Sequence, residues 1–361
     1  MAGTSLRRKA VQLRKRLLFA AVVTLLCLAV VEVLLRIGGV AQTTAEQLFS
    51  DVYDVNYAMV PHAMNPWTDV EEFLNGSGFR GHDVDPKKKP GTYRILSVGD
   101  STTFGTNVRV EQTYMYLLGD MLRGRGLPVE MINAGMPGSS LWKQAIMIEK
   151  RFRNYEFDLV VLYTNYGYRR DYLELRKFME EHRLRMQVRD GLARLHLYKL
   201  LRLWLRPPDF ARHASQYGDL EGFVNSIDDA NTRKLISHYT EQDLKRIKAR
   251  CDKLGVPLLV VPLLSRGVFH DAMAVKAEPG SPWWRFHYLQ AQSAAHTGVV
   301  ARRLGLMVVD ASDEFLKAYY RREMFLDDCH FSPAGHDVLA RMLAEAVCEQ
   351  NLLPAPCAPG G

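Results

Sequence analysis

The sequence predicts an α/β protein built on a doubly wound, five-stranded parallel sheet. Short apolar runs, often with β-branched residues, alternate with segments whose apolar residues recur at helical spacing. The short runs are apolar throughout, which is typical of strands buried on both faces of a sheet. Alternating strands and helices favour a parallel sheet covered by helices on both sides. A helical insertion and an N-terminal transmembrane helix complete the expected architecture.

The expected elements follow in chain order. Five strands are expected, at residues 95–98, 129–133, 158–163, 256–262 and 306–310. Helices with one apolar side are expected at residues 113–125, 141–152 and 333–350. Gly126 directly follows the first of these helices, as a helix-ending glycine does.

The first residues predict a membrane anchor. Residues 17–36 are apolar except for Thr24, Glu32 and Arg36, and about 20 helical residues span a hydrocarbon core. Six basic residues within 1–16 precede this span, which places the N-terminus in the cytoplasm and the rest of the chain across the membrane. A cleaved signal peptide is the alternative, with residues 39–41 as a weak cleavage site.

The remaining chain divides into four expected parts. Residues 37–90 form a juxtamembrane segment and linker, in which 75–81 are a glycine-rich turn. Residues 91–350 form the main domain, 169–250 being its helical insertion, and 351–361 form a tail. Within the insertion, residues 195–205 have an amphipathic helical pattern, which fits either a lid packed on the domain or a helix lying on the membrane.

Composition restricts the class of partner. The 361 residues carry a formal net charge of +7, much of it within residues 1–16 and 169–206. No nucleic-acid-binding motif accompanies this charge, so we expect the membrane as partner and no nucleic acid. The spacing of the five cysteines matches no zinc site, and we expect no metal and no cofactor. Cys348 and Cys357 could pair in an oxidising compartment or remain thiols.

A candidate nucleophile follows the first strand. Gly99 ends that strand, and Asp100 and Ser101 are residues that start helices. The carboxyl ends of strands are where open α/β sheets bind ligands. A nucleophilic serine needs a base and a carboxylate that orients the base, and His330 and Asp327 can supply both from one turn.

The blocks G-D-S-T-T-F-G at 99–105, N-A-G-M-P-G at 133–138 and Asp-x-x-His at 327–330 resemble those of the SGNH/GDSL hydrolase family. The resemblance covers about residues 75–346, and N-x-x-G-F-R-G stretches similar to 75–81 precede the domain in membrane-anchored members. It implies a flavodoxin-like sheet and ester hydrolysis through an acyl-serine. It also implies backbone N–H groups of Ser101 and Gly138 in the oxyanion hole.

The third family block departs from its pattern. A Gly-x-Asn sequence is expected after the third strand, but Asn165 and Gly167 stand here in swapped places. We predict that Asn165 still supplies the side-chain oxyanion donor, the alternative being that it caps the turn. Cys329 as nucleophile and His336 as base are the rival assignments, and the resemblance makes the first a filler position and the second structural.

These observations predict a single-pass, membrane-anchored serine hydrolase facing the periplasm or cell exterior. The expected substrates are acyl esters, such as O-acetyl or carbohydrate esters of envelope glycans. Two alternatives stay open: an acyltransferase acting on envelope glycans, and a binding protein that keeps the fold without turnover. The substrate-determining loops are specific to each protein, so the fold does not name the substrate.

Overall fold

The computed structural model describes residues 2–38, 73–164, 195–205, 230–266, 278–319, 323–327 and 329–358. It also describes single residues or pairs at 173, 176–177, 181–182, 184–185, 188, 191–192 and 224–225. The chain divides into two compact units. One consists of Met1–Thr43 and Glu181–His213, and the other of Thr44–Glu180 and Ala214–Gly361.

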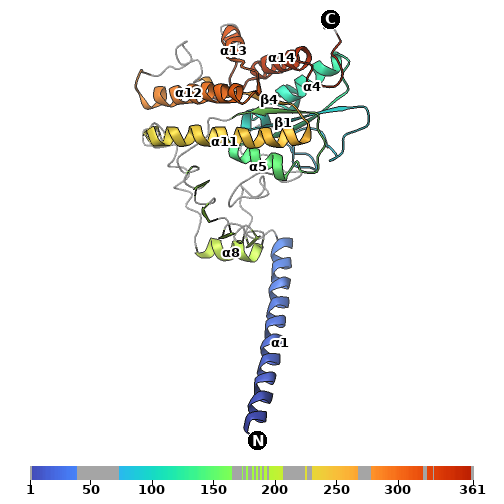
Figure 1. Ribbon diagram of the computed structural model, residues 1–361, viewed down its shortest axis with the longest axis vertical. Coiled ribbons are helices and arrows are strands. Elements are labelled where there is room, and N and C mark those ends of the chain that lie inside the picture. Colours follow the sequence, from blue (N-terminus) through green and yellow to red (C-terminus); the bar gives the residue numbers. More distant parts are fainter. Residues whose placement is uncertain are drawn as a thin grey trace. The chain divides into compact units, whose positions relative to one another are not determined.

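In the first unit, the described residues include helices α1 (Ala2–Ile37) and α8 (His196–Leu205). Helix α1 is the long blue helix of Figure 1, and α8 contacts it. Within the described residues, one helix is long and apolar enough to cross a membrane, through the stretch Val11–Ile37 of α1. The predicted span at 17–36 lies inside this stretch.

The second unit is built on a five-stranded sheet in which every pairing is parallel. Its strands are β1 (Tyr93–Gly99), β2 (Val129–Gly135), β3 (Leu159–Tyr163), β4 (Leu258–Val261) and β5 (Met307–Val308). The order β2-β1-β3-β4-β5 is that of flavodoxin-like, doubly wound sheets. The predicted fold class is therefore confirmed.

Helices cover both faces of this sheet, as Figure 1 shows. On one face, α4 (Tyr114–Gly124), α13 (Ser312–Tyr319) and α14 (Pro333–Glu349) pack on one core. On the other, α5 (Leu141–Lys150) and α11 (Ala230–Leu254) pack on a second core. Helix α12 (Pro282–Arg303) contacts α11, β4 and β5.

The chain changes winding direction between β1 and β3. β2 lies on one side of β1, and β3 and the later strands lie on the other. In doubly wound sheets, ligands bind outside the carboxyl ends of the strands at such a switch point. Gly99, Gly135 and Tyr163 end the three strands that meet there.

Candidate active site

Ser101 is held at the end of β1 by a tight strand-to-helix turn. It begins the short helix α3 (Ser101–Phe104), whose N-cap Asp100 accepts the backbone N–H of Thr102 at 2.9 Å. A Cβ at Gly99 would lie 1.9 Å from Oγ1 of Thr103, so only glycine lets the helix approach the strand this closely. Asp100 thus fixes the turn that presents Ser101, which is the local role predicted for it.

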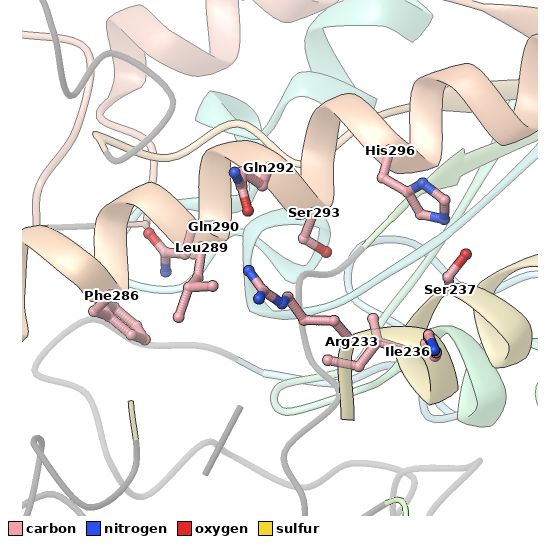
Figure 2. Close-up of a pocket in the computed structure, with 10 residues that line it drawn as sticks. Arg233, Ile236, Ser237, Phe286, Leu289, Gln290, Gln292, Ser293 and His296 are labelled. Carbon is pink, nitrogen blue, oxygen red and sulfur yellow. The ribbon is translucent and has the colours of Figure 1, made fainter. Parts of the chain in front are cut away.

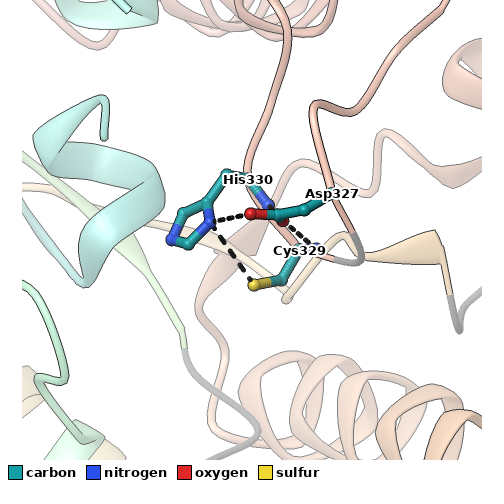
Figure 3. A group of neighbouring side chains, drawn as sticks. All are labelled: Asp327, Cys329 and His330. Carbon is teal, nitrogen blue, oxygen red and sulfur yellow. Dashed lines mark hydrogen bonds and ion pairs between the residues drawn. The ribbon is translucent and has the colours of Figure 1, made fainter. Parts of the chain in front are cut away.

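Asp327 and His330 come together within one turn, shown in Figure 3. Nδ1 of His330 lies 2.6 Å from Oδ2 of Asp327. The other carboxylate oxygen, Oδ1, accepts the backbone N–H groups of Cys329 and His330 at 2.9 and 2.8 Å. Backbone N–H groups of the same turn therefore hold the carboxylate of Asp327 in place, and the carboxylate orients the imidazole of His330.

Ser101 contacts this turn although it lies 229 positions before His330 in the sequence. Its Oγ lies 2.8 Å from Nε2 of His330, and the carbonyl of Cys329 accepts the hydroxyl of Thr102 at 3.2 Å. The structure thus joins Ser101, His330 and Asp327 in one continuous chain of hydrogen bonds. This is the geometry in which an imidazole can take the serine proton.

The electrostatics of His330 and Asp327 are linked. Burial opposes ionisation of Asp327, but the hydrogen bonds from His330 and from the backbone lower the pKa of its carboxyl below the ordinary value. Burial also opposes the charged form of His330, but the hydrogen bonds to Asp327 and Cys329 outweigh it and raise its pKa above 6.5. The protonated form of His330 is therefore stabilised.

The geometry disfavours His336 as the base. This residue is buried in α14, and its Nδ1 accepts the backbone N–H of Tyr114 at 3.2 Å. Burial lowers the pKa of His336 to about 3. His336 therefore packs the interior as a neutral ring.

Cys329 is also poorly placed for catalysis. Its Sγ lies 3.9 Å from Nδ1 of His330, on the side of the ring that faces Asp327 (Figure 3). Burial raises the pKa of the Cys329 thiol, which keeps it neutral and weakly nucleophilic.

Asp327, Cys329 and His330 also place three potential metal-ligand atoms within 4.8 Å of one another. Two ligands of one tetrahedral zinc, each about 2.1 Å from the metal, stand roughly 3.4 Å apart. The Asp327–His330 separation of 2.6 Å is shorter and is that of a hydrogen bond. The cluster therefore matches an oriented base better than a zinc site.

The second block forms a loop at the end of β2. Asn133 ties it to α3, the helix that begins at Ser101, because its Nδ2 donates to the carbonyl of Thr103 at 2.8 Å. Gly138 has φ of 68°, a left-handed conformation that favours glycine. Within the described residues, the N–H groups of Ser101 and Gly138 make no backbone hydrogen bond. Both are thus available to a ligand oxygen.

The third block cannot be placed in the same way. Asn165 and Gly167 lie outside the described residues. Thr164 directly before them donates its backbone N–H to the carbonyl of Val261 at 2.9 Å. The chain therefore enters the third block from the carboxyl edge of the sheet.

Sequence reasoning did not identify Arg80 as part of the site. It treated residues 75–81 as a turn without chemistry, but Arg80 is only 4% exposed. Its guanidinium donates to the carbonyls of Gly105 and Val108 at 3.0 and 2.6 Å and lies 4.9 Å from the Phe104 ring. Arg80 thus braces the end of α3, the helix that carries Ser101. One feature of the sequence could have identified Arg80: it is the only arginine in the glycine-rich turn at 75–81, and glycines allow a turn to pack closely against other backbone.

Lys143 is a second residue that the sequence did not single out. It lies buried near the start of α5, and its Nζ donates to the carbonyl of Gly138 at 3.4 Å. Burial lowers the pKa of Lys143 to about 8. The ammonium group therefore supports the loop that carries Gly138.

A separate hollow of about 380 Å³ lies between α11 and α12 (Figure 2). Apolar side chains such as Ile236, Phe286 and Leu289 line it together with polar ones such as Arg233 and His296. None of its lining residues belongs to the hydrogen-bonded chain of Ser101, His330 and Asp327.

No protein-family model and no curated protein matches this sequence. Among solved structures, the chain is similar to a lipase/acylhydrolase from Enterococcus faecalis, with 16% identity and a TM-score of 0.44 over 74% of this chain and 100% of that one. It is also similar to a member of the lipolytic G-D-S-L family from Veillonella parvula, with 12% identity and a TM-score of 0.41 over 70% and 97%. The acetylxylan esterase Axe2 from Geobacillus stearothermophilus is similar at 14% identity and a TM-score of 0.42 over 72% and 96%.

Proposed function

We propose that this protein is an SGNH/GDSL-type serine esterase, with Ser101 as nucleophile, His330 as base and Asp327 as the carboxylate that orients the base. One observation carries the proposal: the hydrogen-bonded chain from Oγ of Ser101 through both ring nitrogens of His330 to Asp327. A serine hydroxyl is a weak nucleophile until an oriented base takes its proton.

The reaction follows from this arrangement. Nε2 of His330 takes the hydroxyl proton as Oγ of Ser101 attacks the ester carbonyl carbon. The N–H groups of Ser101 and Gly138, with the side chain of Asn165, bind the oxygen that becomes negative. Protonated His330 then passes its proton to the leaving alcohol, and an acyl-serine remains. Water attacks this ester by the same route and releases the acid.

The site is proposed to work at a cell envelope. Val11–Ile37 would anchor the chain in the membrane, and the basic residues before it would keep the N-terminus in the cytoplasm. A disulfide joins Cys348 and Cys357, which supports an oxidising compartment for the second unit. An acyl ester of an envelope glycan, such as an O-acetyl group, is the substrate class that suits this position.

The proposal is tested by labelling the purified protein with a serine-directed fluorophosphonate and by ester hydrolysis. We expect Ser101→Ala to lose both the label and turnover, and His330→Ala to lose turnover. Cys329→Ser should retain most of both, because its thiol lies off the proton path. A folded Cys329→Ser variant as inactive as Ser101→Ala would refute the choice of nucleophile.

The same experiment separates the alternatives. A folded wild-type protein that takes no label would be a binding protein with a hydrolase fold. A labelled protein that transfers the acyl group to added sugar hydroxyls faster than to water would be an acyltransferase. A screen across acyl chain lengths and acetylated glycans would then define the substrate.

A further inference from the structure

In the first unit, Glu32 of α1 holds the beginning of α8. Its Oε1 accepts the backbone N–H of His196 at 3.0 Å, and its Oε2 accepts that of Leu197 at 2.9 Å. Arg36, one turn later on α1, donates to Oε1 at 2.7 Å. The first N–H groups of a helix have no intrahelical acceptor, and negative charge at this end is favourable. Glu32 therefore acts as an N-terminal cap supplied from a distant part of the chain.

This cap fixes the depth of α8 relative to the apolar stretch of α1. Glu32 lies five residues before Ile37, where that stretch ends. At 1.5 Å per residue, the distance along α1 is about 7.5 Å. The first turn of α8 is thus held beside the last turns of the apolar stretch, where a hydrocarbon core gives way to lipid headgroups.

The far end of α8 presents an apolar face that no described residue covers. Leu200, Leu201, Trp204 and Leu205 are 40%, 51%, 79% and 62% exposed. Residues at this spacing lie on one side of a helix, whereas Lys199 falls on the opposite side. On α1, Leu34 and Ile37, which follow Glu32 in the sequence, are also exposed, at 62% and 80%.

We propose that α8 is an in-plane membrane helix. It lies in the outer interface of the bilayer with Leu200, Leu201, Trp204 and Leu205 against lipid acyl chains, and Glu32 holds it at that depth. The proposal rests on the proposed anchoring by α1 and chooses between the lid and the interfacial helix that the sequence left open. Phospholipid is the occupant because the Glu32 cap holds α8, with its exposed apolar face, next to the end of the helix proposed to cross the membrane. Tryptophan is also the side chain most suited to this zone.

The capped helix also bears on the signal-peptide alternative. Cleavage after residue 41 would remove Glu32 and leave the first N–H groups of α8 without this acceptor. An uncleaved α1 is therefore part of the same proposal.

The test uses the full-length protein in phosphatidylcholine vesicles whose acyl chains carry bromine near the headgroup, which quenches nearby tryptophan. We expect the tryptophan fluorescence of the wild type to be quenched, and the part of the quenching that is due to Trp204 to be lost in Trp204→Phe. Trp283→Phe is the matched control, since Trp283 is 51% exposed but belongs to the second unit, and it should be quenched like the wild type. Equal quenching of the wild type and Trp204→Phe would overturn the proposal.

Substitution of the cap tests the depth assignment. Glu32→Leu removes both acceptors and should reduce the Trp204 component at least twofold, whereas Glu32→Gln keeps one acceptor oxygen and should reduce it less. An unchanged component in Glu32→Leu would refute the role of the cap. Concentration-dependent cross-linking through residue 204 without quenching would identify a second copy as the occupant and refute the lipid assignment.

Failure of this proposal can be told apart from failure of the anchor. Intact mass and retention in membranes after an alkaline wash report on α1 alone. A cleaved, released chain would refute the anchor. An intact, retained chain whose Trp204 is not quenched would refute only the membrane position of α8.

Discussion

At the scale of single residues, His330 is subject to two opposing influences. Burial favours the neutral ring, and Asp327 favours the charged ring and prevails, so the pKa lies above 6.5. The charged pair therefore stabilises the fold most fully below pH 6.5, and this contribution is lost as the pH rises through the folded-state pKa. In the proposed mechanism, the reaction rate has the opposite pH dependence, because His330 must be neutral to accept a proton.

The first prediction follows from the raised pKa of His330. We expect kcat/KM to rise with pH along a limb whose apparent pKa lies above 6.5, since this parameter reports the free enzyme. Asp327→Asn should move that limb to lower pH and lower kcat, because the hydrogen bond from Nδ1 loses its charged acceptor. Rates measured from pH 5 to 10 provide the check, and a wild-type limb below 6.5 would contradict the assignment of His330 as base.

The second prediction concerns Asn165. Within residues 164–170 of the sequence it is the only amide side chain, and glycine, which stands at 167, can adopt conformations that other residues avoid. If Asn165 binds the oxyanion, Asn165→Ala should lower kcat by roughly two to three powers of ten with little change in KM. A well-folded variant with near-normal kcat would leave the Ser101 and Gly138 N–H groups as the oxyanion hole.

The residues of the site differ in how far the sequence could predict them. Ser101, Asp327 and His330 lie in short patterns whose chemistry is local: a serine after a strand, and a carboxylate three residues before an imidazole. Arg80 and Lys143 act through carbonyls that belong to other segments. Their positions depend on tertiary packing, which residue spacing does not encode.

At the scale of elements, the segment before β1 is an internal support of α3. The Arg80 guanidinium satisfies carbonyls at the end of that helix in a buried place, and a buried acceptor left unpaired costs about 1–3 kcal/mol. The position of Ser101 therefore depends on a segment whose backbone pairs with a strand of the sheet at one isolated bridge among the described residues, between Arg80 and Asn133.

The third prediction tests this support. Arg80→Met should lower the melting temperature by several degrees and lower kcat more than it raises KM, because it loosens the end of α3. Arg80→Lys should fall between Arg80→Met and the wild type, since one ammonium cannot reproduce the forked donors. Arg109→Met is the control, because Arg109 is exposed, and it should change neither quantity. Equal effects of Arg80→Met and Arg109→Met would refute the role of Arg80.

The elements that the sequence predicted are those with a strong apolar pattern. The five strands, α4, α5 and α14 begin and end within a few residues of their expected limits. Helix α12 was missed because its apolar spacing is irregular: it begins with exposed Trp283 and continues through alanine, serine and glutamine. Helix α13 was missed although its apolar residues share one side, because it is only eight residues long. The start signal was present, since Ser281 caps α12 and Pro282 occupies its first turn.

At the scale of the whole molecule, the chain has a part that could be a membrane anchor and a part that carries the candidate site. We predict that the mature protein keeps residues 17–36 and stays with membranes after a high-salt wash. The reason is the apolar run at residues 17–36, which follows six basic residues and lies within the unburied candidate span Val11–Ile37. N-terminal sequencing provides the measurement, and a mature chain that begins at Gln42 would show a cleaved signal instead.

The division into two units could not be predicted from the sequence. Residues 169–250 have the composition of a single insertion, but Glu181–His213 group with the N-terminal helix, and Ala230–Leu254 form the crossover helix before β4. The contact that joins α8 to α1 connects residues 164 positions apart. Neither periodicity nor a local motif reports a contact of that range.

The distance along the chain between Glu32 and α8 has a consequence for the order of events during synthesis. At about 5–20 residues per second, roughly ten to thirty seconds pass between the two partners leaving the ribosome. During this interval Arg36 is the only partner of Glu32 among those seen in the finished unit. Carbodiimide should therefore modify Glu32 in chains arrested before residue 195 and spare it in finished ones. Helix α1 is therefore synthesised first, with Glu32 exposed, and α8 binds to it only after the later part of the chain has been made.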